Sequence, residues 1–300
     1  MKNKIKIFLK EKIKLKYPSE YIDNFYHKRK INKDKEIYKD KYSSEDILNK
    51  LIKMGLKKGD TLFIHSSWNH FFNYKGKPGE LINILLTYLT EEGTLVMPCF
   101  PAIQDASKVF NIKRTPSGAG FLTEMFRRYK GTLRSVNLNH SVCAFGKNAE
   151  FLTKDHHKSK TSWDEMSPYY RLKEVDALIV GLGVGYNLEV ATSLHCVESI
   201  LRKEIYYYSL LFTDKVEYKY KDISGDIGIH SYLKRRGSID TKKISKYFSE
   251  EELVESKLSN LEIYSIRADL LISRAIKLGR KGITMYTSPK PKNKLFKVIR

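Results

Sequence analysis

The chain has 300 residues, and its hydrophobic content of 41% with 12% aromatic residues excludes a globally disordered protein. The formal net charge of +21 raises the possibility of nucleic-acid binding, but no zinc-finger spacing, basic-zipper heptad or ribonucleoprotein aromatic signature accompanies it. No apolar run is long enough to cross a bilayer. The three cysteines, Cys99, Cys143 and Cys196, lack paired or metal-ligand spacing. We therefore expect a cytoplasmic protein without a structural metal.

The first 42 residues form a basic extension, and residues 43–300 are predicted to form one domain. Residues 1–40 hold 13 Lys and Arg against 6 Asp and Glu. Residues 4–16 can form a basic amphipathic helix that either lies on an acidic membrane surface or packs on the domain with its lysines in water. A non-catalytic nucleic-acid or membrane-surface binder that uses this extension is the competing hypothesis from another class.

Beyond the extension, helix and strand signals alternate along the chain. Ser43 and Asp46 form a capping box for an amphipathic helix that ends near Gly55. Later helices are predicted at 80–89, 121–129 and 268–278, and strands at 61–64, 94–97, 142–145, 177–182 and 282–286. Residues 101–117 read as a loop, and residues 205–212 and 215–220 as an antiparallel pair rich in tyrosine. This alternation favours an α/β domain with a mixed sheet flanked by helices.

Residues 190–198 (VATSLHCVE) follow the strand at 177–182 and a glycine-rich bend, in the order strand, turn and helix start. Thr192 or Ser193 can cap that helix. His195 and Glu198 are three residues apart, so they share one face of a helix. A carboxylate beside an imidazole fixes its tautomer and raises its basicity, as a general base requires. The alternative is a partly buried histidine with a surface glutamate.

Six motifs in this order resemble the aminoglycoside 3-N-acetyltransferase family over about residues 43–275. They are residues 59–67 (GDTLFIHSS), 92–98 (EGTLVMP), 133–135 (LRS), 140–142 (HSV), 181–186 (GLGVGY) and 192–195 (TSLH) with Glu198. The resemblance implies a three-layer fold and an acyltransferase that moves an acetyl or larger acyl group from acyl-CoA to an amino group of a sugar. It also implies no metal, and it leaves a homo-oligomer open.

The resemblance also implies roles for residues of the matching motifs. His195, Glu198 and Asp105 would be catalytic, although the loose match in the loop also fits Gln104 in place of Asp105. The residues expected to contact the coenzyme are His65, Ser66, Ser67, Arg134, Ser135 and Ser141. His140 and Thr192 would line the acceptor site. One branch of the family has His-Pro where this chain has Asn137 and Leu138, so the turn before His140 loses the constraint of a proline.

Two further readings concern cysteine and histidine. Cys196 beside His195 suggests an acyl-cysteine route, but adjacent helical side chains diverge, so we expect direct transfer between two bound substrates. His156 and His157 in a lysine-rich stretch read as a surface loop.

The basic charge bears on the acceptor. Aminoglycosides are polycations, whereas a nucleotide-linked amino sugar carries a pyrophosphate that a basic protein attracts. We therefore expect an amino-sugar nucleotide of surface-polysaccharide biosynthesis as the acceptor. An aminoglycoside, and with it antibiotic resistance, is the alternative.

Overall fold

The structure, a computed structural model, describes residue 29 and residues 31–299 apart from residue 187. The helix predicted over 4–16 lies outside the described residues. Tyr42, the last residue of the predicted extension, is buried, and its backbone N–H donates to the Asn73 carbonyl oxygen at 3.1 Å. The predicted boundary between extension and domain stays a prediction.

A seven-stranded mixed sheet forms the centre of the protein. Its strand order is β10-β11-β6-β1-β2-β5-β4, in which β6, β1 and β2 run parallel and the remaining neighbours pair antiparallel. The sheet confirms the predicted fold class. Its strands are β1 (Thr61–Ser66), β2 (Thr94–Pro98), β4 (Leu133–Arg134), β5 (Val142–Gly146), β6 (Leu178–Leu182), β10 (Val254–Leu258) and β11 (Leu261–Arg267).

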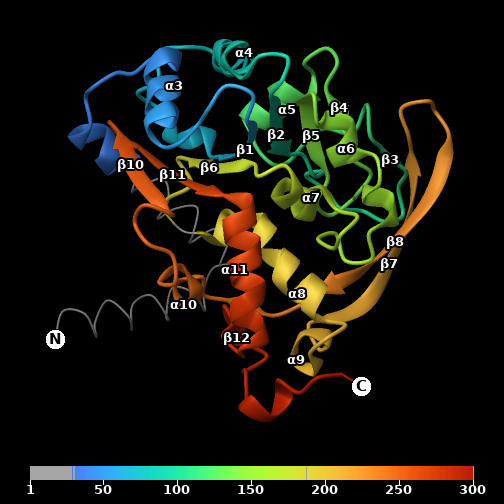
Figure 1. Cartoon of the computed structure of the whole chain (residues 1–300). Coiled ribbons are helices and arrows are strands. Elements are labelled where there is room, and N and C mark those ends of the chain that lie inside the picture. Colours follow the sequence, from blue (N-terminus) through green and yellow to red (C-terminus); the bar gives the residue numbers. More distant parts are fainter. Residues whose placement is uncertain (1–28, 30, 187, 300) are drawn as a thin grey trace.

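Helices cover both faces of this sheet, and Figure 1 shows α3 and α4 above it and α8 and α11 below it. Leu62 and Ile64 of β1 pack into one apolar core, whereas Phe63 packs into the other. Because successive strand residues face opposite sides, β1 is apolar throughout and both of its faces are buried. The helices are α3 (Ser44–Lys53), α4 (Pro78–Leu89) and α5 (Phe121–Arg127) on one face, and α6 (Ala149–Thr153), α7 (Pro168–Glu174), α8 (Cys196–Leu201) and α11 (Ala268–Arg280) on the other.

The first of these helices begins as its sequence predicts. The Ser43 hydroxyl accepts from the Asp46 backbone N–H at 3.2 Å, and the Asp46 carboxylate accepts from the Ser43 backbone N–H at 2.8 Å. This capping box satisfies two backbone donors that a helix leaves free at its start. The helix ends before Gly55, whose φ of 100° lies in the region that favours glycine.

A long hairpin, β7 (Phe212–Lys221) and β8 (Ile227–Arg235), extends along one side of the molecule (Figure 1) and pairs with β3 (Phe110–Asn111). The predicted pair of strands at 205–212 and 215–220 is wrong, because residues 206–209 form the short helix α9 (Tyr206–Ser209). Tyr207 and Tyr208 are adjacent and both fully buried, whereas a strand with one solvated face buries alternate residues.

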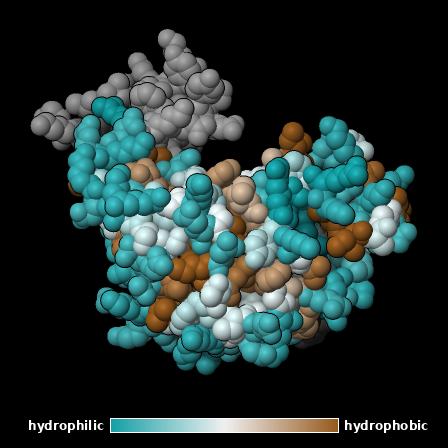
Figure 2. All heavy atoms as spheres, turned by 90° about the horizontal axis from the view of Figure 1, so that it is seen from above, coloured by the Kyte–Doolittle hydropathy of each residue, from teal (hydrophilic) through white to brown (hydrophobic). Residues whose placement is uncertain are grey.

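The remaining elements are short. They are β9 (Ser238–Ile239), β12 (Tyr286–Ser288), α10 (Lys242–Ser245) and the 3-10 helices Trp68–His70, His156–Lys158, Leu188–Val190, Thr192–His195 and Asn293–Leu295. Seen from above, hydrophilic residues dominate the rim of the molecule and a hydrophobic band crosses its middle (Figure 2). Within the described part of the chain, no helix has the length and apolar character that crossing a membrane requires.

Candidate active site

The pair His195 and Glu198 lies at the junction of two helical segments. The 3-10 turn Thr192–His195 runs directly into α8, which brings the side chains together. His195 Nδ1 lies 2.7 Å from Glu198 Oε1, and the glutamate side chain is fully buried. The alternative of a surface glutamate is therefore wrong. A carboxylate accepts but does not donate, so Nδ1 carries the proton and Nε2 is left as the proton acceptor.

The predicted helix cap at this junction is also wrong. Thr192 and Ser193 lie inside the 3-10 turn, and the N-cap of α8 is His195, which makes no side-chain capping bond. The Leu194 backbone N–H already donates to the Ala191 carbonyl oxygen at 2.9 Å. Thr192 itself is half-buried, one 3-10 turn before His195.

Two residues from distant parts of the chain complete the surroundings of the carboxylate. The Tyr286 hydroxyl lies 2.6 Å from Glu198 Oε1, and Arg235 Nε lies 3.8 Å from the same oxygen. Arg235 Nη1 donates to the Tyr286 hydroxyl oxygen at 3.0 Å. The sequence analysis missed both residues, because no local motif links them to residue 198.

An aromatic side chain connects this pair to His140. The Trp163 ring centroid lies 5.1 Å from that of His195 and 4.4 Å from that of His140. Burial, followed by the charge of His195, holds the pKa of His140 well below its usual range. His140 therefore borders the same site as His195, where it stays neutral. Trp163 was not predicted, since a single tryptophan carries no motif.

The turn that carries His140 is held without a proline. The Asn137 side-chain oxygen accepts from the backbone N–H groups of Asn139 and His140, at 3.0 and 2.8 Å. The Leu138 backbone N–H, which a proline would lack, donates to the Tyr218 hydroxyl at 2.9 Å. This chain thus replaces a rigid ring with hydrogen bonds, one of which comes from the β7–β8 hairpin.

The carboxyl end of β1 presents His65, Ser66 and Ser67 as predicted. Burial lowers the pKa of His65 to about 3, so its ring is neutral. Ser66 and Ser67 are half-buried. A Cβ atom at Gly183, whose φ is 69°, would lie 3.2 Å from the Ser67 carbonyl oxygen and 2.7 Å from His70 Cβ. The ends of β1 and β6 therefore approach closely at a position that only glycine permits.

Arg134, Ser135 and Ser141 have partners inside the protein. The Arg134 guanidinium donates to the backbone carbonyl oxygens of Cys99, Ile112 and Thr115. The Ser141 hydroxyl donates to the Cys99 carbonyl oxygen at 2.8 Å, and both serines are fully buried. These contacts hold loops together, and they do not bring the three residues to the end of β1.

His156 is buried, which makes the prediction of a surface loop wrong for this residue. Its Nδ1 lies 2.8 Å from the Ser135 hydroxyl, and its Nε2 lies 3.1 Å from the Ser162 carbonyl oxygen. Burial lowers the pKa of His156 to about 3. Its ring is therefore a neutral structural link.

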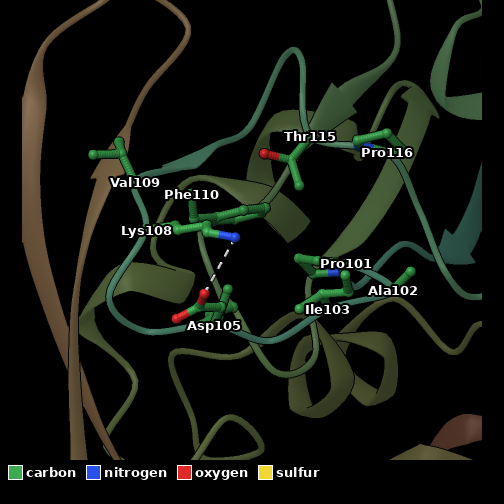
Figure 3. A pocket seen from close by; sticks show the side chains of 10 residues that line it. Pro101, Ala102, Ile103, Asp105, Lys108, Val109, Phe110, Thr115 and Pro116 are labelled. Carbon is green, nitrogen blue, oxygen red and sulfur yellow. Dashed lines mark ion pairs between the residues drawn. The ribbon is translucent and has the colours of Figure 1, made fainter.

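Asp105 lines a cavity of about 320 Å³ in the loop after β2 (Figure 3). Apart from Asp105, Lys108 and Thr115, its lining is apolar: Pro101, Ala102, Ile103, Val109, Phe110, Pro116 and Leu138. The Ser107 hydroxyl donates to Asp105 at 2.6 Å and lowers the pKa of the carboxyl, with a smaller contribution from Lys108 at 3.5 Å. Gln104, the alternative, donates to the Asn139 carbonyl oxygen at 3.2 Å. Asp105 therefore offers a fixed negative charge.

Cys196 is fully buried, and burial raises the pKa of its thiol well above the usual range. A thiol in this state is a poor nucleophile, which argues against the acyl-cysteine route. Within residues 29 and 31–299, leaving out 187, no group of three or more His, Cys, Asp or Glu side chains could hold a metal ion.

Comparison with known proteins identifies relatives of this arrangement. A family model described as aminoglycoside 3-N-acetyltransferase matches residues 63–279. The SPbeta prophage-derived aminoglycoside N(3')-acetyltransferase-like protein YokD of Bacillus subtilis (strain 168) is 28% identical over 178 residues, which cover 52% of this chain and 64% of the relative. The matched part is thus less than two thirds of that protein.

Solved structures share the fold. Aminoglycoside acetyltransferase AAC(3)-IVa in complex with a gentamicin superposes with a TM-score of 0.67 at 21% identity, covering 81% of this chain and 90% of that one. AAC-IIIb in a binary complex with CoASH superposes with a TM-score of 0.66 at 18% identity, covering 80% and 97%. The predicted resemblance and the three-layer fold are confirmed.

Proposed function

Because the chain belongs to the aminoglycoside 3-N-acetyltransferase family, we propose that it transfers an acetyl group from acetyl-CoA to an amino group of an aminoglycoside. The observation that carries the chemistry is the buried pair of His195 and Glu198, with 2.7 Å between Nδ1 and Oε1. This geometry supplies a neutral imidazole whose second nitrogen can accept a proton.

In the proposed reaction, Nε2 of His195 takes a proton from the acceptor ammonium. The amine nitrogen then attacks the thioester carbonyl carbon, the new nitrogen–carbon bond forms, and the carbon–sulfur bond breaks. The coenzyme leaves as a thiolate that takes up a proton, and the amide product is released. Glu198 stabilises the imidazolium formed in the first step, because a buried carboxylate interacts strongly with a neighbouring cation.

We place the donor at the carboxyl end of β1. The half-buried hydroxyls of Ser66 and Ser67 can bond to the amides of pantetheine, and the close approach at Gly183 keeps this end of the sheet narrow. His65 borders the same end. Support for an acyl-CoA donor comes from the neighbour AAC-IIIb, which was solved with CoASH. Arg134, Ser135 and Ser141 are left out of this slot, because their polar atoms bond to the protein itself.

The relatives favour an aminoglycoside over the nucleotide-linked amino sugar that the basic charge suggested. Related proteins are named aminoglycoside N(3)-acetyltransferases, and AAC(3)-IVa was solved with a gentamicin and with apramycin. Asp105 is proposed to bind an ammonium group of the acceptor rather than to remove its proton, since its lowered pKa makes it a weak base. His140 and Thr192 are proposed to line the acceptor site.

The test is thiol release from acetyl-CoA, run in parallel with a panel of aminoglycosides and with UDP- and dTDP-linked amino sugars. The proposal expects release with one or more aminoglycosides, and mass spectrometry of the product should show one added acetyl group. Release with the nucleotide sugars alone would overturn the proposed acceptor while keeping the chemistry. No release with either set, or with propionyl-CoA as the donor, would overturn the acyltransferase.

A further inference from the structure

We propose that Tyr286 and Arg235 are positioning residues that keep the carboxylate of Glu198 ionised and fixed against His195. This inference deepens the proposed function and rests on the role of His195 in it. Neither residue was singled out by the sequence, and both reach Glu198 from elements far along the chain.

Glu198 Oε1 receives two hydrogen bonds. His195 Nδ1 lies at 2.7 Å and the Tyr286 hydroxyl at 2.6 Å from this one oxygen. Two donors on one oxygen fix the direction of the carboxylate more firmly than either donor alone. Hydrogen bonds to a charged acceptor are also stronger than those between neutral groups.

Arg235 sets the direction of this chain of hydrogen bonds. Its Nη1 lies 3.0 Å from the Tyr286 hydroxyl oxygen, and a guanidinium donates but never accepts. The tyrosine hydroxyl therefore accepts from Arg235 and must donate its own hydrogen to Glu198. Arg235 Nε lies 3.8 Å from Oε1, so the cation also favours the ionised carboxylate directly.

The network is built into the protein interior, away from any substrate. Tyr286 is fully buried and belongs to β12, which pairs with β9. A Cβ at Gly237 would lie 3.0 Å from the Tyr286 ring, so the backbone packs directly on this side chain. The cavity that borders Glu198 and Tyr286 measures about 10 Å³, too small for a substrate. Both residues can therefore influence the reaction only through His195.

Other titratable groups around Glu198 are silent near neutral pH. Burial raises the pKa of the Tyr207 hydroxyl to about 12, and it raises the pKa values of Tyr208, Tyr286 and the Cys196 thiol above their usual ranges. Across Trp163, His140 stays neutral because burial lowers its pKa, and Arg235 stays charged. Proton uptake near neutral pH therefore belongs to the pair of His195 and Glu198.

The test compares Tyr286→Phe with the wild type in the pH dependence of kcat/KM. Loss of the hydroxyl removes a donor that favours the negative charge, so the pair takes up a proton at higher pH. We expect the acid limb of the profile to move up by about one pH unit, the size that one charge-assisted hydrogen bond gives. We also expect kcat to fall at least tenfold while KM for the acceptor changes little.

Matched variants separate positioning from structural damage. Tyr207→Phe removes another buried hydroxyl, which donates to the Pro289 carbonyl oxygen at 2.7 Å, and it should leave the acid limb in place. Arg235→Gln should move the limb in the same direction as Tyr286→Phe, and Arg235→Lys should restore part of the shift. An acid limb that stays unmoved in Tyr286→Phe, or moves equally in Tyr207→Phe, would overturn the inference.

A second readout works without turnover. NMR of the His195 imidazole follows its protonation against pH in wild type and in Tyr286→Phe, and the midpoint should rise in the variant. If the wild type acetylates no acceptor, the proposed function fails, but the inference about the network still stands or falls on this midpoint. An unchanged midpoint would overturn it.

Discussion

Replacing Glu198 by glutamine keeps the size of the side chain and removes its charge. The carboxylate is fully buried and accepts from His195 Nδ1 at 2.7 Å and from Tyr286 at 2.6 Å. In the proposed reaction the imidazole becomes a cation beside this group. The variant therefore tests how much the negative charge contributes to the rate.

The expected size follows from the geometry. Opposite unit charges about 4 Å apart interact by about 4 kcal/mol at the effective dielectric of ~20 that describes protein sites. Each 1.36 kcal/mol is about tenfold in rate, so Glu198→Gln should lower kcat roughly a thousandfold. KM for the acceptor should change little, because the buried carboxylate does not touch substrate.

The assay is thiol release from acetyl-CoA at saturating acceptor, with thermal unfolding measured alongside. Glu165→Gln removes an exposed carboxylate three residues before Pro168, at the start of α7, and should keep full turnover. A Glu198→Gln protein that folds and keeps more than about a tenth of the wild-type kcat would refute the reasoning, since a tenfold loss corresponds to only about 1.4 kcal/mol.

Three further variants test the sheet, the acceptor loop and a surface ion pair. Gly181→Ala should lower the free energy of unfolding by about 1–3 kcal/mol, because its Cβ would lie 2.1 Å from Tyr264 Cε1; urea unfolding measures this. Asp105→Asn should raise KM for an aminoglycoside about three- to tenfold with little change in kcat or melting temperature. Asp155 has a pKa lowered to about 2 by Lys158 first and then by Arg171 at 2.6 Å; its contribution to stability is therefore present above pH ~4 and is lost as the pH falls towards 2. Asp155→Asn should be less stable than wild type at pH 7 and equal to it at pH 2.

Each of these has a control or an opposing result. Gly79→Ala places a Cβ in open space, so it should not destabilise the protein; equal losses in Gly181→Ala and Gly79→Ala would contradict the packing argument. An unchanged KM in Asp105→Asn would remove that residue from the acceptor site. A constant stability difference from pH 7 to pH 2 would show that the Asp155 carboxylate does not act through its charge.

Much of the fold was predictable because its signals are local. The capping box at Ser43, the apolar run of β1 and the bend at Gly183 each depend on residues close together in the sequence, and each lies where the sequence predicts it. The segment 205–212 was misassigned because tyrosine favours strands, whereas burial of both Tyr207 and Tyr208 against the core favours a helix.

The site was predictable only in part, for a related reason. The spacing of His195 and Glu198 is local, and the predicted pair is present in the structure. Trp163, Arg235 and Tyr286 reach the pair through tertiary packing, and no spacing within the sequence links them to it. Arg134 resembled a phosphate contact because guanidinium groups often bind phosphate, but here it bonds to loop carbonyl groups.

The most direct test of the central claim is turnover of His195→Ala against wild type, with acetyl-CoA and the aminoglycoside that gives the fastest thiol release. The account predicts that the variant folds, binds both substrates and loses at least a hundredfold in kcat, the typical contribution of a general base. It also predicts that the residual rate rises steeply with pH, because only an already deprotonated amine can then react. Full turnover by His195→Ala would contradict the account.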